Sequence, residues 1–353
     1  MAVYRPHRTE CNGYDYTHRA CNERCFDMKA IVPVAGKGTR LRPLTHSTPK
    51  ALLRVGAKPI LGHLIDGLLA IGADHLIIII SPDGGDIAAY IRTTYPSLGL
   101  DVVIQTEQLG LGHAVSLTEQ AARGSDIIIM YGDTIVEGDL SGLIDPSVDG
   151  VIAVKEVEDP RRFGVVNVRD GFITRFVEKP EKPESNLAII GLNYIAKSDV
   201  LFDCLREVID RNMTTKGEYQ ITDAFELMLD RGLKMKPHPV SGWFDAGTHE
   251  TLLETNAHLL KTDANCDNLP GSVILPPVFV HPSARITRSI IGPHATIGEN
   301  VTVENSIVAD SIINDNARVS NALLRLSLVG KNALVAGKNE KMVIGDHSSI
   351  EFE

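Results

Sequence analysis

The chain has 353 residues, of which 43% are hydrophobic and 23% charged, and its formal net charge is −10. This composition is ordinary for a folded protein that is long enough for two domains. The negative charge argues against a general nucleic-acid or anionic-membrane surface, because either needs a basic face. No apolar run approaches the roughly 20 residues that span a bilayer. The N-terminus also lacks the apolar segment of a secretion signal, so we expect a cytoplasmic protein.

The first 27 residues differ from the rest of the chain. They contain Cys11, Cys21 and Cys25, three of the five cysteines. The spacing of these cysteines matches neither a disulfide framework nor a zinc site. We therefore expect residues 1–27 to be a disordered extension and a folded domain to begin at Met28.

A glycine-containing segment follows the first predicted strand, residues 30–34. It reads Gly36-Lys37-Gly38-Thr39-Arg40, and Lys50 comes shortly after it; we call residues 36–50 the glycine loop. Where a strand turns into the next element, backbone N–H groups can approach phosphate oxygens. The loop fits neither the dinucleotide-binding nor the Walker pattern. With the cations Arg40 and Lys50 close together, it indicates a site for a nucleoside triphosphate.

Strands and helices alternate through the next hundred residues. Apolar spacing predicts helices over 60–69 and 112–122, and short apolar runs predict strands over 76–80, 102–105 and 127–131. This alternation predicts an α/β fold, a doubly wound and mostly parallel sheet whose ligands bind beyond the carboxyl ends of its strands. Gln105 and Asp133 are both expected at such ends.

A repeat begins at residue 278. Pairs of a small or aliphatic residue and an aliphatic residue recur every five or six positions, from Val278/Val280 to Ala333/Val335. This period is typical of a hexapeptide-type left-handed parallel β-helix, although a sandwich of short strands is the alternative. We expect residues 28–265 to form the first domain and 266–353 the β-helix. The faces of such a helix commonly pack against copies of themselves, so we expect a homo-oligomer.

The glycine loop also carries a family resemblance. The pattern A-G-x-G-T-R-L-x-P-L-T-x-x-x-P-K, from Ala35 to Lys50, resembles the pyrophosphorylase loop of the sugar-1-phosphate nucleotidyltransferases. Further motifs are similar to the long form of glucose-1-phosphate thymidylyltransferase, and the resemblance covers roughly residues 28–353. In chain order these motifs are Gln105–Ala114, Tyr131–Thr134, Phe163–Val166, Val177–Pro180, Gly217–Asp223, Trp243–Gly247 and Met342–Asp346.

The resemblance implies transfer of a nucleotidyl group, by first choice from dTTP, to a sugar-1-phosphate such as glucose-1-phosphate, with release of pyrophosphate. A sugar phosphate loses its second proton near pH 6, so the nucleophile is already ionised and needs no general base. The protein must supply positioning and charge neutralisation, together with a metal ion.

The same resemblance implies a role for each motif. Arg40 and Lys50 are implied as catalytic residues, and Asp133 and Asp245 as the ligands of Mg²⁺. The residues implied to bind the nucleotide are Ala35, Gly36, Gly38, Thr39, Arg40, Gln105 and Gly110. Those implied to bind the sugar phosphate are Gly164, Glu178, Lys179 and Asn193.

Two departures leave the specificity open. The opening Val32-Pro33-Val34-Ala35-Gly36 resembles the uridylyltransferases, so the base is thymine or uracil. Asn193 stands where long thymidylyltransferases usually have tyrosine, which leaves the sugar open. A non-catalytic subunit that senses sugar nucleotides is one alternative function. An acyltransferase built on the β-helix is another, although His281 and His294 are the only histidines in its regular part.

Overall fold

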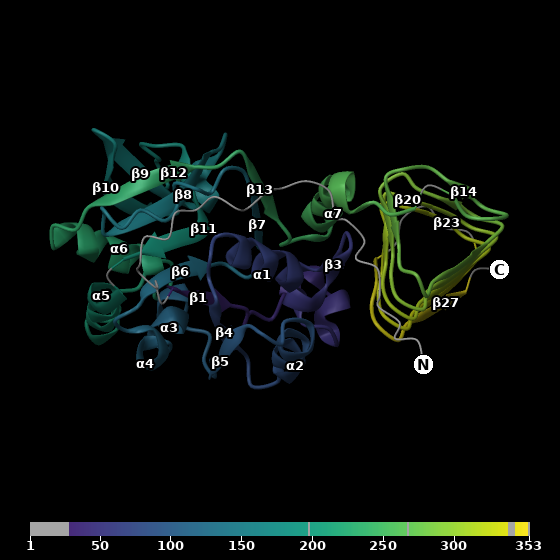
Figure 1. The fold of residues 1–353 in the computed structure, drawn as a ribbon, viewed down its shortest axis with the longest axis horizontal. Helices are drawn as coiled ribbons and strands as arrows, with labels where there is room; N and C mark the ends of the chain where they lie inside the picture. Colours follow the sequence, from purple (N-terminus) through teal and green to yellow (C-terminus); the bar gives the residue numbers. More distant parts are fainter. Residues whose placement is uncertain (1–27, 197, 267, 338–342, 352–353) are drawn as a thin grey trace, which may run out of the picture.

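A computed structural model describes residues 28–196, 198–266, 268–337 and 343–351. The extension expected at 1–27 lies outside the described residues. An α/β domain and a triangular β-helix stand side by side, and helix α7 (His249–Asp263) lies between them (Figure 1). In the part of the chain that the structure describes, none of the helices has the length and apolar character needed to cross a bilayer.

The α/β domain is built on one large sheet, in the order β10-β9-β11-β6-β1-β4-β5. Its parallel half consists of β1 (Met28–Pro33), β4 (His75–Ile80), β5 (Gly99–Ile104) and β6 (Asp126–Met130). In the other half, β11 (Leu187–Ile195) runs antiparallel to β6. The remaining strands of this half are β8 (Gly150–Glu156), β9 (Gly164–Arg169), β10 (Phe172–Glu178) and β12 (Met235–Pro239). The predicted α/β fold is confirmed, with a sheet that is mixed.

Helices cover both faces of this sheet, which explains why its central strands are apolar without alternation. Ala30 and Val32 of β1 belong to one buried cluster, while Ile31 between them belongs to the other. Successive side chains of a strand point to opposite faces, so a strand covered on both sides is apolar throughout. The first cluster packs under α1 (Ile60–Ala70) and α2 (Gly85–Thr94). The second packs under α3 (Leu111–Ser116), α5 (Ser198–Asp210) and α6 (Ile221–Asp230).

The helix predicted over 112–122 is interrupted. The structure has α3 ending at Ser116 and a separate α4 (Glu119–Ala122). Between them the Thr118 hydroxyl donates a hydrogen bond to the Val115 carbonyl, at 2.7 Å. A threonine side chain that binds nearby backbone competes with the helical hydrogen bonds, and this break follows from it.

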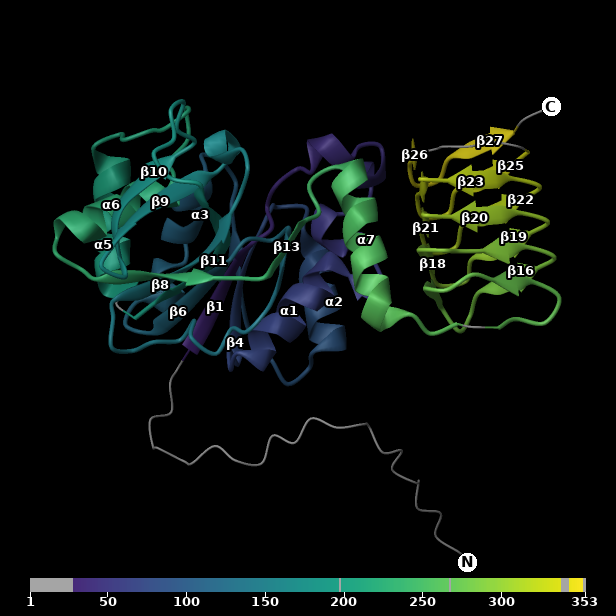
Figure 2. The same cartoon turned by 90° about the horizontal axis from the view of Figure 1, so that it is seen from above.

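The β-helix stacks short strands into three parallel sheets, as predicted (Figure 2). Aliphatic side chains such as Ile297, Val303 and Val319 fill its interior. Many corners hold asparagine at positive φ, for example Asn305 and Asn321, a conformation that asparagine tolerates better than most residues. The first sheet contains β14 (Val273–Ile274), β17 (Ile290–Ile291), β20 (Ile307–Ala309) and β23 (Leu323–Arg325). The second contains β15 (Val278–Val280), β18 (Ala295–Ile297), β21 (Ile312–Ile313), β24 (Leu328–Val329) and β26 (Val343–Ile344). The third contains β16 (Arg285–Thr287), β19 (Thr302–Glu304), β22 (Arg318–Ser320), β25 (Leu334–Ala336) and β27 (Ser349–Glu351).

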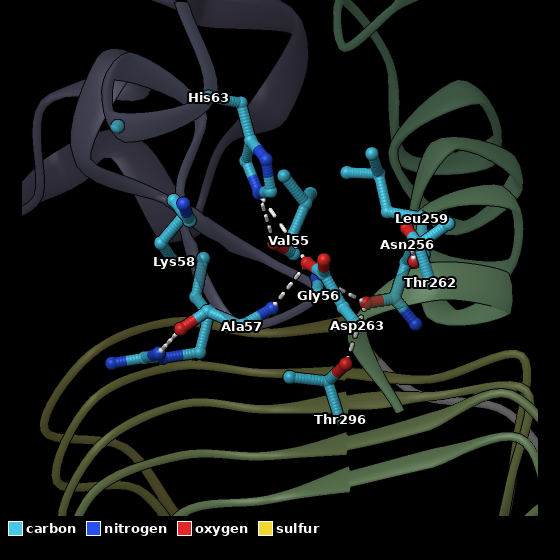
Figure 3. A network of polar contacts seen from close by, with 12 residues as sticks. Val55, Gly56, Ala57, Lys58, His63, Asn256, Leu259, Thr262, Asp263 and Thr296 are labelled. Atoms are coloured by element: carbon cyan, nitrogen blue, oxygen red, sulfur yellow. Dashed lines mark hydrogen bonds and ion pairs between the residues drawn. The ribbon is translucent and has the colours of Figure 1, made fainter. Parts of the chain in front are cut away.

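The second sheet of the β-helix faces the α/β domain. Its residues Ile312 and Leu328 are 0% exposed and belong to the same apolar cluster as Leu44 and Leu53. Asn256 of α7 joins the two domains through polar contacts (Figure 3). Its Oδ1 atom accepts hydrogen bonds from the Gly56 amide, at 2.9 Å, and from the Thr296 hydroxyl, at 2.7 Å. One of the three faces of the β-helix is therefore buried within the chain itself.

Candidate active site

A cavity of about 550 Å³ opens at the carboxyl ends of β1, β5 and β6. This is the edge where an open parallel sheet places its ligands. The glycine loop follows β1, Gln105 follows β5 and Asp133 follows β6. The predicted site residues that line the cavity are Ala35, Gly36, Gly38, Thr39, Arg40, Lys50, Gln105, Gly110 and Asp133.

Gly38 lets the glycine loop fold back on itself. It has φ +59°, and a Cβ atom there would lie 3.0 Å from Thr45 Cγ2 and 3.2 Å from Lys50 Cβ. Both the backbone angle and the close approach favour glycine. The Gly38 carbonyl accepts a hydrogen bond from the Thr45 hydroxyl, at 2.8 Å. The fold of the loop thus places Lys50 against the glycines and on the cavity wall.

Lys50 and the two predicted metal ligands form one charged group. The Lys50 ammonium donates to Asp133 Oδ2 at 2.7 Å, and the lysine side chain is only 15% exposed. Asp245 ends β13 (Gly242–Asp245), which pairs with β7 (Thr134–Glu137), and the next amide, of Ala246, donates to the Asp133 carbonyl at 3.1 Å. Burial raises the pKa of Asp245, and the negative charge of Asp133 adds to this.

This pair of carboxylates fits a magnesium ion. Burial first, and then the charge of Asp133, raises the pKa of Asp245, and a bound cation would counter both effects. Throughout the described ranges, no group of three or more His, Cys, Asp or Glu side chains is placed to hold a metal. Magnesium is often held by one or two carboxylates, with substrate phosphates and water as its other ligands. Asp133 and Asp245 are sufficient for that mode of binding.

The segment from Gln105 to Gly112 forms another wall of the cavity. Gln105 is 6% exposed, and its amide nitrogen lies 3.4 Å from His113 Nδ1. At Gly110, which has φ +114°, a Cβ atom would lie 2.6 Å from the Tyr219 carbonyl oxygen. The Tyr219 amide donates a hydrogen bond to the Leu109 carbonyl, and the Tyr219 carbonyl accepts one from the Gly112 amide, both at 2.8 Å. These contacts hold the segment in place beside the base that we expect there.

The residues expected to bind the sugar phosphate lie apart from the lining of this cavity. Glu178 accepts a hydrogen bond from Thr222 at 3.1 Å and lies 3.2 Å from the Lys179 ammonium. A Cβ atom on Gly164 would lie 2.9 Å from Glu178 Oε2, so these residues form one cluster. Burial and then the charge of Glu178 raise the pKa of Tyr131, which does line the cavity. The cluster therefore lies within electrostatic reach of the cavity wall at Tyr131.

Asn193 has an unusual environment. It lies on β11 and is 0% exposed, and neither polar atom of its side chain meets hydrogen-bond geometry with a described residue. Its amide nevertheless lies close enough to the Tyr131 hydroxyl to oppose the rise that burial causes in the pKa of that group. A buried amide without partners is costly, because it loses its hydrogen bonds to water. A polar ligand that reached this amide would satisfy it.

Some residues of the site are absent from the sequence-based prediction. Gln108, Tyr131 and Glu218 line the cavity, and Gln108 donates to the Ala35 carbonyl at 2.7 Å. Outside the cavity lining, the rings of Phe163 and Trp243 meet edge to face, with centroids 5.0 Å apart. Each of these residues lies inside a motif quoted above, so the motifs could have pointed to them in the sequence.

Comparison with known proteins decides the family. The sequence profile of the family described as nucleotidyl transferase matches residues 29–262. The chain belongs to this family. The prediction of a nucleotidyltransferase is thereby confirmed. The site roles given above remain predictions for this nucleotidyltransferase.

The relatives of this nucleotidyltransferase include proteins that match it over nearly the whole length of both chains. The low-salt glycan biosynthesis nucleotidyltransferase Agl11 of Haloferax volcanii is 30% identical, over 92% of this chain and 100% of its own. A glucose-1-phosphate thymidylyltransferase of Streptomyces griseus is 29% identical, over 92% and 99%. The UTP–glucose-1-phosphate uridylyltransferase AglF of Haloferax volcanii is 34% identical, but over only 66% of this chain and 96% of its own.

A solved structure supports the fold. The crystal structure of a putative glucose-1-phosphate thymidylyltransferase from Bacillus anthracis, in complex with a sucrose, aligns with a TM-score of 0.59 and 28% identity. It covers 68% of this chain and 98% of the Bacillus chain.

Proposed function

We propose that this nucleotidyltransferase transfers a thymidylyl group from dTTP to glucose-1-phosphate, releasing pyrophosphate. The observation that carries the proposal is the single cavity that gathers Arg40, Lys50, Asp133 and Gln105 around the glycine loop. It combines groups that can neutralise phosphate charge with a buried amide that can read a base. We propose a cytoplasmic location, as expected from the sequence.

The chemistry follows from the positions of the cations. The sugar phosphate oxygen attacks the α-phosphorus of the nucleotide, and the bond from that phosphorus to the pyrophosphate breaks. Lys50, held at the cavity wall, would move from the Asp133 carboxylate to the reacting phosphates. The planar guanidinium of Arg40 can hold two phosphate oxygens and so stabilise the leaving pyrophosphate. Neither step requires a general base.

Asp133 and Asp245 would hold Mg²⁺ on the substrate phosphates. When bound, the ion neutralises phosphate charge and helps to align the reacting groups. In the structure Asp133 accepts a hydrogen bond from Lys50. If Asp133 served instead as a ligand of the ion, the Lys50 side chain would be free to contact substrate.

Gln105 favours a pyrimidine base but does not separate thymine from uracil. Its amide offers both a donor and an acceptor, which match the polar edge that these two bases share. Thymine is our first choice because the thymidylyltransferase from Streptomyces griseus aligns through the β-helix as well, whereas the uridylyltransferase AglF aligns over 66% of this chain. Uridylyl transfer by the same mechanism is the second candidate, favoured by the higher identity to AglF.

The sugar would bind beside Tyr131. Glu178 can accept hydrogen bonds from sugar hydroxyls, and Lys179 can hold the sugar phosphate. The unpaired amide of Asn193 would complete this subsite. Asparagine replaces the tyrosine usual at this position in the long thymidylyltransferases, so we propose that the subsite selects its sugar differently.

Pyrophosphate release tests the proposal. The enzyme is incubated with Mg²⁺ and glucose-1-phosphate, and with dTTP, UTP, GTP, ATP or CTP in parallel. We expect the highest kcat/KM with dTTP, then UTP. A clear preference for UTP would replace thymidylyl by uridylyl transfer. Turnover with none of the five would contradict the proposal and favour a non-catalytic sensing subunit.

We also propose that the enzyme forms a homo-oligomer through its β-helix. The sheet that begins with β14 presents an outward column of Val273, Ile290, Ile307 and Leu323, aligned by strand pairing. Val273 is 52% exposed, and Ile307 and Leu323 are each 41% exposed. Exposed aliphatic side chains in a continuous column suit contact with a second copy of the same face.

A further inference from the structure

The motif near the C-terminus, Met342–Asp346, has no role in the chemistry above. Of its residues, 343–346 are described. Asp346 lies in the last coil of the β-helix, yet its Oδ2 atom accepts hydrogen bonds from the hydroxyls of Ser47 and Thr48 in the glycine loop. Its Oδ1 atom accepts a hydrogen bond from the Lys331 amide of the preceding coil, at 2.7 Å. The carboxylate thus joins the β-helix to the loop two residues before Lys50.

The residue before Asp346 makes the approach possible. A Cβ atom on Gly345 would lie 2.9 Å from Pro43 Cβ and 3.2 Å from the Pro43 carbonyl oxygen. Any larger side chain would push the last coil away from the glycine loop. Gly345 and Asp346 therefore both contact the glycine loop. Gly345 allows the close approach because it has no side chain, and Asp346 makes the hydrogen bonds.

Open space lies beside the same part of the loop. A second hollow of about 540 Å³ is lined by residues 45–50 and, opposite them, by residues 81–84, 86 and 87. Lys50 also lines the main cavity, so the segment that carries it forms a wall between two hollows. Leu44 and Ala51 anchor the two ends of this segment in the apolar cluster, and between them the hydrogen bonds from Ser47 and Thr48 to Asp346 tie it to the β-helix.

Further contacts continue along the β-helix. The Arg54 guanidinium lies 3.4 Å from Asp315, two coils before Asp346, and Gly56 reaches Thr296 through Asn256 (Figure 3). The chain from Pro43 to Gly56 therefore runs along one face of the β-helix, and Asp346 is the contact nearest to Lys50 in sequence.

We propose that Asp346 is a positioning residue for Lys50. By holding the Ser47 and Thr48 hydroxyls, it fixes the end of the glycine loop and keeps the Lys50 ammonium where the reacting phosphates pass. The β-helix thereby takes part in nucleotidyl transfer without touching substrate. The inference rests on the proposed function for its effect on turnover, while the ordering of the loop stands on the contacts alone.

A mispositioned Lys50 has a distinct kinetic signature. The lysine acts on charge that develops in the transition state, so its displacement should lower kcat more than it raises KM. An error of about 1 Å in placing a catalytic group can cost on the order of 10²-fold in rate. Loss of a merely structural contact would instead lower the thermal midpoint and leave kcat per folded molecule unchanged.

The chain offers a matched control in Asp315. Asp315 and Asp346 occupy equivalent turns of different coils. Asp315 Oδ1 accepts a hydrogen bond from the Glu299 amide of the preceding coil, at 2.9 Å, and Asp346 Oδ1 accepts one from the Lys331 amide in the same way. Both also contact the α/β domain, but Asp315 contacts Arg54, beyond the glycine loop. Asp346→Ala should lower kcat by about tenfold or more with less than threefold change in the KM for nucleotide. Asp315→Ala should keep kcat within about threefold.

A double-mutant cycle tests the route through the loop. If Asp346 acts through the loop hydroxyls, adding Ser47→Ala and Thr48→Val to Asp346→Ala should lower kcat by less than about threefold further, because coupled sites are not additive. Full additivity, or equal kcat for Asp346→Ala and the parent, would overturn the inference. So would equal losses in the Asp346 and Asp315 variants.

Hydrogen exchange, measured without substrate, separates this inference from the proposed function. Peptides covering residues 44–53 should exchange faster in Asp346→Ala than in the parent or in Asp315→Ala. Unchanged exchange there would overturn the ordering role even in an active enzyme. If the parent turned over no nucleotide, the proposed function would fail, and the exchange result would still decide whether Asp346 orders the loop.

Discussion

Replacing Lys50 with alanine is the sharpest test of the site. Two opposite unit charges 2.7 Å apart, the distance between Lys50 Nζ and Asp133 Oδ2, attract by about 6 kcal/mol at an effective dielectric constant of about 20. A phosphate oxygen that took the place of this carboxylate oxygen would gain a similar attraction. Water reaches 36% of the Asp133 side chain and screens part of it. We therefore expect Lys50→Ala to cost about 3 to 4 kcal/mol, or about 10²- to 10³-fold in kcat.

The assay is pyrophosphate release at saturating glucose-1-phosphate, with the nucleotide varied to separate kcat from KM. Lys155→Ala is the matched control, because this lysine binds the Ser241 carbonyl outside the cavity lining. Circular dichroism should show that both variants keep the parent fold. If Lys50→Ala retained kcat within about threefold of the parent, the lysine would not act on the transition state, and the reasoning from its position would be wrong.

Further substitutions test other parts of the molecule. Asp133→Asn should raise the Mg²⁺ concentration needed for half-maximal activity, by about tenfold, because a charged ligand is lost; an unchanged titration would exclude it as a ligand. Asn193→Leu should leave the thermal midpoint unchanged or higher, since it removes unpaired buried atoms, and should raise the KM for sugar phosphate alone; a lower midpoint with normal KM would mean a structural role. Leu323→Glu should convert the oligomer to monomers in light scattering, and a parent that is monomeric at micromolar concentration would rule out the proposed assembly. The hydrogen bond from the Ser147 hydroxyl is the main cause that lowers the pKa of Asp145 to about 2; a lowered pKa stabilises the fold above the ordinary carboxyl pKa near 4, so the stability lost in Asp145→Asn should shrink as pH falls from about 5 to 2 in urea unfolding.

Local patterns were enough to predict the fold class and the motifs. The glycine loop could be read from a short stretch because its chemistry depends on neighbouring residues, Gly38 and Lys50 among them. The β-helix could be read because each coil repeats the same small and aliphatic spacing. In both cases the physical cause acts over a few residues, so the sequence displays it directly.

Contacts between distant segments could not be read in this way. Lys50 and Asp133 are 83 residues apart, and Thr48 and Asp346 are 298 apart. Nothing in either segment alone specifies its partner. The antiparallel direction of β11 is similar, because a buried strand is apolar whichever way it runs. Asn193 was named as a sugar ligand by resemblance, but its lack of partners depends on the packing of several strands.

The apolar cluster that contains Leu44, Leu53, Ile312 and Leu328 has a consequence for how the molecule unfolds. Each domain also has an apolar cluster of its own, but this third cluster is shared, because its side chains come from both domains. Unfolding of the β-helix would expose Leu44 and Leu53 to water. The loss of this buried apolar surface would lower the free energy of unfolding of the α/β domain. Calorimetry should accordingly show one cooperative transition for the described domains, in place of two independent ones. The β-helix then belongs to the folding unit of the enzyme and is not an exchangeable appendage.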